Sequence, residues 1–406
     1  MREALLNNGI RVVTERRPDV RSVAMGVWVE QGSAHEAPEF AGVSHLMEHL
    51  VFKGTERRNA HEIALSLESL GGSLDAYTTR EYTSYQAHVL DEHLPVALDV
   101  LADLVLSPRL DPADLELEKD VVIEEIAGVE DTPDDLIFDL HGERFWKGHT
   151  YGRPILGTRE TVRAFHIDDL RALHAERYRG KNMVLGCVGN VEHDEVVSRF
   201  AKLFGEVDPG SASPVIDRPT ETSSGRISVV RDASQAHILI ANSTPSYGDP
   251  SRNALILIAG AFGGGMSSRL FQRVREELAL AYAVYSFQSF YSKAGLAGVY
   301  VGTRPEAAEK ALSAILEEYA KLWEQGITDQ ELEQAKSHAK GRSILAMEST
   351  GSRLLRLVGF TLRGEPYRSL DESLARIDAV TQDEVRAACL QYYNPEDQFT
   401  LTLGPS

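Results

Sequence analysis

The sequence predicts an α+β protein made of two homologous domains, each with a layer of helices packed on a layer of strands. Three observations lead to this prediction. The chain has 406 residues, more than the roughly 100–200 residues of a typical single domain. A segment rich in Pro, Gly and Ser lies near its middle. The order of expected strands and helices before this segment is repeated after it, as an internal duplication would produce.

In the first half, strands are expected wherever β-branched and aromatic residues alternate with polar ones, and helices wherever apolar residues recur with a period of 3.6. The pair Gly71-Gly72 is expected to end one helix. The expected strands are residues 12–14, 22–29 and 183–188, with paired strands in 74–90; the expected helices are 43–52, 60–70, 94–106, 112–129 and 167–178.

The boundary between the halves is expected within residues 205–225. This segment holds Pro209, Gly210, Pro214 and Pro219 among Ser and Thr residues, and it has no periodic apolar pattern. We therefore divide the chain into an N-terminal domain of residues 1–208, a linker of residues 209–225 and a C-terminal domain of residues 226–406.

The second half repeats the first at a shift of 217 residues, which sets Asp114-Leu115 against Glu331-Leu332. Under this shift Arg342 occupies the place of Glu125, and the HxxEH motif of the first half has no counterpart. The halves are therefore expected to share architecture but not chemistry. Strands are expected at residues 227–230 and 237–241 and within 281–301, and helices at 253–261, at 306–324 and from about 328 onward.

The composition is that of a globular protein, with 43% hydrophobic and 25% charged residues. The net charge of −19 argues against nucleic-acid binding and would attract cationic partners such as basic peptides. The alternative is an acidic surface that serves only solubility. Cys187 and Cys389 form neither a disulfide framework nor a CxxC metal site. With no expected signal peptide or membrane span, we predict a bacterial cytoplasmic protein. The alternative is a mitochondrial matrix protein whose transit peptide has been removed.

One pentapeptide, His45-Leu46-Met47-Glu48-His49, has the ligand spacing of a zinc site. On a helix, positions 45 and 49 are one turn apart on the same face. Two imidazoles so placed can hold one Zn²⁺, and Glu48 lies beside them. The pattern HxxEH is the inverzincin motif. The alternative is a pair of helical histidines that bond to backbone or water.

A catalytic zinc usually has three protein ligands and one open position, so a third ligand is required. The best candidates lie in Val121-Val122-Ile123-Glu124-Glu125, on a separate expected helix. Glu118 and Glu125 are seven residues apart and share one face of that helix, whereas Glu124 points elsewhere. Such a carboxylate pair is usually only solvated, so this helix alone is weak evidence.

Together with the pentapeptide, three further segments resemble the pitrilysin family of inverzincin metallopeptidases, which includes insulin-degrading enzyme and the mitochondrial processing peptidase β-subunit. The resemblance is to the two-domain, processing-peptidase-like bacterial branch. The separation of 76 residues between His49 and Glu125 matches these members and selects Glu125 over Glu124 as third ligand. Glu118 matches a family carboxylate that orients a liganding histidine. The three segments are Phe52-Lys53-Gly54-Thr55, Gly71-Gly72-Ser73-Leu74-Asp75-Ala76-Tyr77-Thr78 and residues 118–125.

The resemblance extends to the second half through Gly263-Gly264-Gly265-Met266-Ser267-Ser268-Arg269-Leu270. Arg275 and Tyr282, seven residues apart, match a family pair that faces the zinc across a cleft. Without the resemblance, Arg275 would be interpreted as a surface charge and Tyr282 as a core residue.

The resemblance implies a zinc endopeptidase with one Zn²⁺ per chain, bound by His45, His49 and Glu125. Glu48 would be the general base, and Tyr282 with Arg275 would stabilise the oxyanion. The substrate would pair as a strand with Asp75, Ala76 and Tyr77. Asp75 departs from the Asn that is common in relatives, and its added negative charge would either alter substrate pairing or favour basic peptides.

The resemblance also implies that the chain forms half of a clamshell chamber that admits short or unfolded peptides. A homodimer is our first expectation, because both the zinc motif and the Arg/Tyr pair occur in one chain. Two alternatives stay open: a precursor-processing subunit that needs an inactive paralogue, and a non-catalytic scaffold of the same fold.

Overall fold

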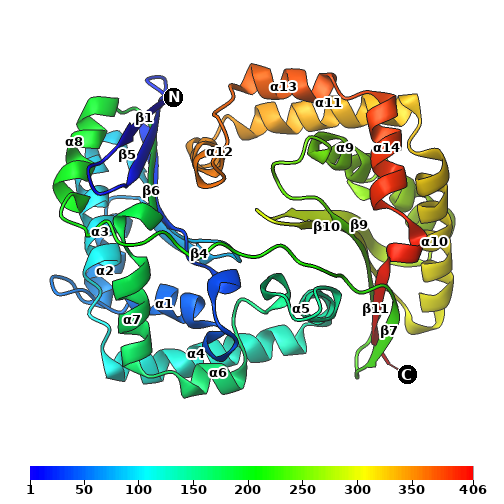
Figure 1. Ribbon diagram of the computed structural model, residues 1–406, viewed down its shortest axis with the longest axis horizontal. Coiled ribbons are helices and arrows are strands. Elements are labelled where there is room, and N and C mark those ends of the chain that lie inside the picture. The colour runs from blue at the N-terminus through cyan, green and yellow to red at the C-terminus, as the bar shows by residue number, and fades with distance from the viewer. Residues whose placement is uncertain (406) are drawn as a thin grey trace. The chain divides into compact units, whose positions relative to one another are not determined.

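The computed structural model describes residues 1–405 and has a mixed helix and sheet architecture (Figure 1). The chain forms two compact units, which are described separately below. Unit 1 comprises Met1–Ala127, Arg153–Ile216 and Ala346–Tyr367. Unit 2 comprises Gly128–Gly152, Asp217–Leu345 and the segment that begins at Arg368. The predicted α+β class with two similar domains is confirmed. The position of the linker between these domains, at residues 209–225, stays a prediction.

Within the described residues, unit 1 is built on a six-stranded sheet in the order β1-β2-β6-β3-β5-β4. β2 and β6 are parallel, and the other neighbouring pairs are antiparallel. β4 pairs with β5 alone, so one edge of its backbone is available for further pairing. The strands are β1 (Arg2–Leu5), β2 (Arg11–Arg16), β3 (Ser22–Val29), β4 (Ser73–Thr78), β5 (Thr83–Leu90) and β6 (Met183–Gly189).

Most helices of unit 1 pack into one continuous apolar core with one face of this sheet. Among them, α3 is buried along most of its length, which explains its uniformly apolar sequence. Asn59 and Glu62 form a capping box that begins α2, and Gly71, at φ 72°, follows its end. The helices are α1 (Val43–Val51), α2 (Ala60–Glu68), α3 (Leu94–Leu106), α4 (Pro112–Asp131, which ends in unit 2), α6 (Arg159–Ala164), α7 (Ile167–Arg177) and α8 (His193–Phe204).

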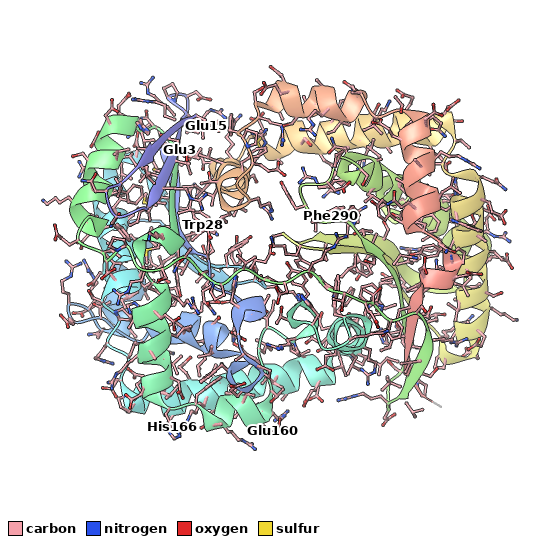
Figure 2. All side chains as sticks on the ribbon, in the orientation of Figure 1. Glu3, Glu15, Trp28, Glu160, His166 and Phe290 are labelled. Atoms are coloured by element: carbon pink, nitrogen blue, oxygen red, sulfur yellow. The ribbon has the colours of Figure 1, made fainter. Side chains whose placement is uncertain are left out.

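The other face of the unit 1 sheet is covered by a helix from late in the chain, α12 (Thr350–Leu362), which packs on β6, β2 and β3. Its Leu354, Leu357 and Val358 form a separate cluster with apolar residues of the sheet that include Trp28 (Figure 2). A side chain at Gly186 would lie 2.6 Å from Val358, so glycine is required for this close approach. The sheet is thus sandwiched between helices from both halves of the sequence.

Within the described residues, unit 2 has a five-stranded sheet in the order β7-β11-β8-β10-β9. One face forms a core with α9, α10 and α14. The other face contacts α5, whose Phe138 and His141 pack against aromatic rings of the sheet. The elements are β7 (Gly225–Val230), β8 (Ala236–Thr244), β9 (Ala281–Phe290), β10 (Gly295–Thr303), β11 (Phe399–Gly404), α5 (Pro133–Phe145), α9 (Arg252–Gly263), α10 (Ala308–Gln325), α11 (Asp329–Ala346), α13 (Leu370–Asp378), α14 (Gln382–Tyr392) and a π-helix at Phe271–Glu277.

The duplication extends to two helices that are exchanged between the halves of the sequence. A shift of 217 residues carries Pro133–Phe145 onto Thr350–Leu362, so α5 and α12 are equivalent. Each packs on the sheet of the other half of the chain. Short 3₁₀ turns complete the described structure at Ser33–His35, Pro38–Phe40, Asp91–His93, Thr150–Gly152, Gly180–Asn182, Pro305–Ala307 and Pro395–Asp397.

The helices differ in hydropathy from membrane-spanning segments. Among the described residues, no helix has both the length and the apolar character needed to cross a bilayer.

A buried histidine in unit 2 predicts acid sensitivity. Burial of His141 between Phe145 and Phe399 lowers its pKa from 6.5 to about 4. The unfolded chain therefore takes up the proton first, and stability is lost as pH falls from 6.5 toward 4. Between about pH 7 and pH 5, the wild type is expected to lose about 2 kcal/mol more free energy of unfolding than His141→Gln. Denaturant unfolding of both proteins at each pH measures this difference. An equal pH dependence in the variant and the wild type would contradict this expectation.

Candidate active site

The HxxEH residues lie on α1, whose start is fixed by a buried carboxylate. Glu36 accepts hydrogen bonds from the backbone N–H groups of Gly42 and Ser44, each at 2.8 Å. Gly42 adopts φ 94°, and a side chain there would lie 2.5 Å from the Leu156 carbonyl oxygen. Leu46, Met47, Leu50 and Val51 anchor the other side of the helix in the core of unit 1. His45, Glu48 and His49 are therefore presented from a rigid element.

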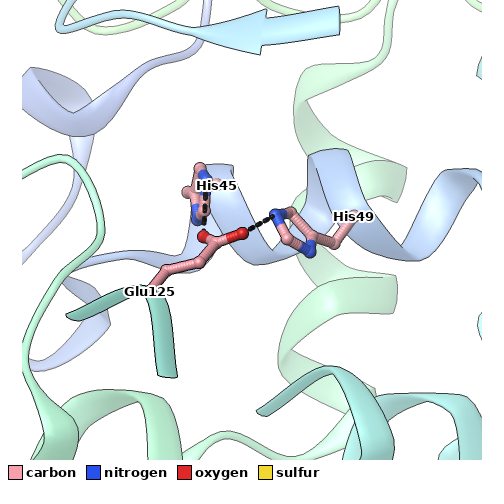
Figure 3. Close-up of side chains that lie close together, drawn as sticks. All are labelled: His45, His49 and Glu125. Carbon is pink, nitrogen blue, oxygen red and sulfur yellow. Dashed lines mark ion pairs between the residues drawn. The ribbon is translucent and has the colours of Figure 1, made fainter. Parts of the chain in front are cut away.

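The three predicted ligands converge on one point (Figure 3). His45 Nε2 lies 3.7 Å from Glu125 Oε2, and His49 Nε2 lies 3.6 Å from Glu125 Oε1. One ligand atom from each residue lies within 4.8 Å of the others. Glu124, the neighbouring carboxylate on α4, is exposed and does not belong to this group.

The geometry of these side chains fits a zinc ion. The two His–Glu distances exceed hydrogen-bond lengths, so the three groups are not satisfied by one another. Ligand atoms about 2.1 Å from a tetrahedral metal are separated by about 3.4 Å, close to the spacing found here. Two imidazoles and one carboxylate also form a donor set that catalytic zinc uses.

The protonation state of His45 and the orientation of the His49 ring favour metal binding. Burial, together with the neighbouring His49, lowers the pKa of His45 from 6.5 to about 4, so its imidazole is neutral near pH 7. His49 Nδ1 forms a hydrogen bond of 2.9 Å with Glu118 Oε2. This bond directs His49 Nε2 toward Glu125, and such pairing orients a liganding ring.

Glu48 lies beside the cluster but is not part of it. Burial raises the pKa of its carboxyl group, and a hydrogen bond from Thr78 opposes this shift. That bond joins Thr78 Oγ1 to Glu48 Oε2 at 2.5 Å. A carboxylate with a raised pKa accepts a proton more readily than an ordinary surface carboxylate near neutral pH.

The predicted substrate-binding residues lie on β4, at the edge of the unit 1 sheet and in contact with α1. Asp75 is exposed, whereas Ala76 and Tyr77 are half-buried. Thr78, the last residue of this strand, is the one that bonds Glu48. The edge strand and the expected base are therefore physically connected.

Arg275 and Tyr282 lie together in unit 2, on the π-helix and on β9 respectively. The Arg275 guanidinium carbon is 5.1 Å from the centroid of the Tyr282 ring. Both residues line a pocket of about 370 Å³. Tyr282 is 80% exposed, so its hydroxyl is accessible, unlike that of a core tyrosine.

Comparison with known proteins identifies the family. Residues 11–159 match the family model described as insulinase (peptidase family M16), and residues 164–338 match the model described as peptidase M16 inactive domain. An uncharacterized zinc protease, YmxG of Bacillus subtilis, is 39% identical over 98% of this chain and 97% of its own length. The chain belongs to peptidase family M16.

Further relatives are also named zinc proteases. Uncharacterized zinc proteases of Streptomyces coelicolor and Mycobacterium leprae are 38% and 40% identical over 95% and 96% of this chain, and over 86% and 88% of their own lengths. Two solved structures share the fold at 21% identity. One is titled as a peptidase M16 inactive domain from Pseudomonas fluorescens, with a TM-score of 0.94 and coverage of 100% of this chain and 98% of that one. The other is a protease from Helicobacter pylori, with a TM-score of 0.91 and coverage of 100% and 99%.

The M16 assignment confirms the predicted resemblance and supports a zinc-dependent metallopeptidase. The label of inactive domain for the second match agrees with the absence of a second HxxEH motif from the sequence. The individual residue roles stay predictions.

Three residues with contacts at this site were given no role by the sequence analysis: Glu36, Lys53 and Thr78. Lys53 Nζ lies 2.6 Å from Glu118 Oε1, and the contacts of Glu36 and Thr78 are described above. Lys53 and Thr78 stand in the segments that resemble the M16 family, which was the one signal that pointed to them.

Proposed function

We propose that this chain is a zinc endopeptidase that hydrolyses short or unfolded peptides, with one Zn²⁺ held by His45, His49 and Glu125. The observation that carries the proposal is the convergence of both Nε2 atoms on the Glu125 carboxylate, with Glu48 next to them. When bound, zinc supplies Lewis-acid chemistry, which polarises a peptide carbonyl and lowers the pKa of water.

Glu48 is the general base in this proposal. Its carboxylate takes a proton from the attacking water and later delivers that proton to the leaving amine. The hydrogen bond from Thr78 leaves the second oxygen of Glu48 available for the transfer. Glu118 holds the ring of His49 in the orientation that ligation needs.

The substrate is proposed to add as an extended strand to β4. Backbone hydrogen bonds would supply affinity with modest sequence preference, which suits unfolded peptides. The exposed carboxylate of Asp75 and the net charge of −19 favour basic peptides. We further propose that a second copy of the chain completes an enclosed chamber around the substrate. The proposed location of the enzyme is the bacterial cytoplasm. Sedimentation or light scattering in solution would test the dimer.

The function is tested with an unstructured fluorogenic peptide and the purified full-length chain. We expect cleavage that stops when a chelator removes the metal and returns when one equivalent of Zn²⁺ is restored. A chain that binds zinc but cleaves no peptide would instead support the scaffold alternative. Activity that appears only with a sequence-related partner would support the precursor-processing alternative.

Thr78→Val is expected to lower kcat by about 10- to 100-fold, because Glu48 loses the hydrogen bond that holds its carboxylate in position. A hydrogen bond to a charged group is worth about 1.5–3 kcal/mol. Zinc content should stay unchanged, since Thr78 contacts Glu48 and none of the three proposed ligands. Steady-state kinetics beside elemental analysis provide the measurement. Thr78→Ser keeps the hydroxyl and should retain most activity; equal losses in both variants would argue against this role.

Tyr282→Phe is expected to lower kcat by about 10- to 1,000-fold without loss of zinc, because it removes one proposed donor to the oxyanion. The exposed position of Tyr282 makes a loss of folding stability small. Kinetics and thermal unfolding of the variant are the measurements. A lower melting temperature with full activity would indicate a structural role.

A further inference from the structure

The segment Phe52-Lys53-Gly54-Thr55 directly follows α1 and has no part in the chemistry proposed above. We propose that Lys53 is a positioning residue: it holds Glu118 against His49 and so raises the affinity of the site for zinc. This inference rests on the proposed zinc site and adds a determinant of metal affinity to it.

One carboxylate bridges the lysine and the histidine. Lys53 Nζ lies 2.6 Å from Glu118 Oε1, and Glu118 Oε2 lies 2.9 Å from His49 Nδ1. Each oxygen of Glu118 therefore has its own partner. The two contacts together fix the rotation of the carboxylate, and with it the direction in which the His49 ring points.

The burial of Glu118 explains why a cation is needed. Its side chain is 5% exposed, whereas that of Lys53 is 37% exposed. A buried carboxylate is costly unless a charged group or several hydrogen bonds compensate it. The His49 ring supplies one hydrogen bond, and Lys53 supplies a direct contact with a positively charged group. Without Lys53, rotation of Glu118 away from His49 would meet less resistance.

The backbone beyond Lys53 is clamped to α3, so the lysine starts from a fixed position. Asp103, buried on α3, accepts hydrogen bonds from Thr55 Oγ1 at 2.8 Å, Arg57 Nε at 2.9 Å and Arg58 Nη1 at 2.5 Å. Gly54 adopts φ 148°, a value that side chains disfavour, and this allows the chain to turn between Lys53 and Thr55.

The direction in which the zinc affinity changes when Lys53 is replaced distinguishes a positioning role from simple charge repulsion. Lys53 is a cation near a proposed divalent metal, and removing a nearby cation would by itself favour zinc binding. Removing a group that positions Glu118 should instead weaken zinc binding. The two explanations therefore predict opposite changes in Kd.

The test is a zinc titration of the metal-free, full-length chain against a competing chelator. We expect Lys53→Met to raise the zinc Kd about tenfold, the low end of the 10- to 100-fold range for residues that support a ligand. Lys53→Arg keeps the charge and should stay within about threefold of the wild type. Lys119→Met is the control: the Lys119 side chain is 10% exposed and pairs at 2.7 Å with Glu116, whereas the carboxylate that pairs with His49 is that of Glu118.

A double-mutant cycle tests whether Lys53 acts through Glu118. In a Glu118→Gln background, Lys53→Met should cause no further change in Kd. An unchanged or tighter Kd for Lys53→Met, or an equal loss in both backgrounds, would overturn the inference. Lys53→Gln is the second variant should Lys53→Met fail to fold. If the Lys53 variants bind zinc normally while Glu125→Gln loses zinc affinity, this inference alone would be overturned. A wild-type chain that binds no zinc would overturn the proposed function as well.

Discussion

Glu48→Gln is expected to lower kcat for an unstructured peptide by about 10²- to 10⁴-fold while the protein still binds one zinc ion per chain. Glutamine keeps the shape of the side chain and its contact with Thr78, but its amide cannot accept the proton of the attacking water. Glu48 does not belong to the group of His45, His49 and Glu125, so the metal should stay in place. Kinetics and elemental analysis on the same preparation measure both quantities.

The control for this experiment is Glu68→Gln, which removes an exposed carboxylate at the end of α2. It should leave both kcat and zinc content unchanged. A zinc-loaded Glu48→Gln protein with full activity would exclude Glu48 as the base. Loss of zinc together with activity would instead place Glu48 among the ligands.

Local signals explain which parts of the fold were predictable from the sequence. α3 was predicted with both of its ends, and the predicted 43–52, 112–129 and 183–188 lie within two residues of α1, α4 and β6. Pro112 at the start of α4 and Gly71 after α2 act through their own backbone conformation. A single sequence is sufficient to recognise them.

The exchanged helices could not be predicted in this way. α5 and α12 were not expected as elements, and each finds its partner sheet in the other half of the sequence. The buried residues of α5 are Leu136, Ile137, His141 and Phe145, and the polar His141 interrupts the apolar stripe by which a surface helix is recognised in a sequence. The placement of these helices depends on packing between residues far apart in the sequence, such as that of α12 on Gly186. The local periodicity of the sequence does not encode such packing.

The same distinction applies to the candidate site. His45, Glu48 and His49 share one helical turn, so their spacing alone places them together. Glu125 lies on another helix and was chosen over Glu124 by resemblance; the structure brings Glu125 to the histidines. Thr78 and Lys53 reach their partners through tertiary contacts with Glu48 and Glu118. Such contacts leave no pattern in a single sequence, so these two roles were missed.

Glu125→Gln is expected to weaken zinc binding by about 10²- to 10³-fold and to abolish metal-dependent cleavage at limiting zinc. Zinc bound by four protein ligands gains about 10–16 kcal/mol, or about 2.5–4 kcal/mol per ligand, and a neutral amide recovers little of this. The two histidines would remain beside each other on α1, with ring centroids 4.7 Å apart, and would form an incomplete site. Competition with a chelator measures the affinity.

The neighbouring residue provides the matched control for this prediction. Glu124 lies on the same helix, one position away, and its exposed side chain is outside the cluster. Glu124→Gln changes the net charge by the same amount, so any general electrostatic effect on cation binding should appear in both variants. A large loss of zinc in Glu125→Gln alone would therefore report coordination. A larger loss in Glu124→Gln would show that the third ligand had been assigned one residue too late in the chain.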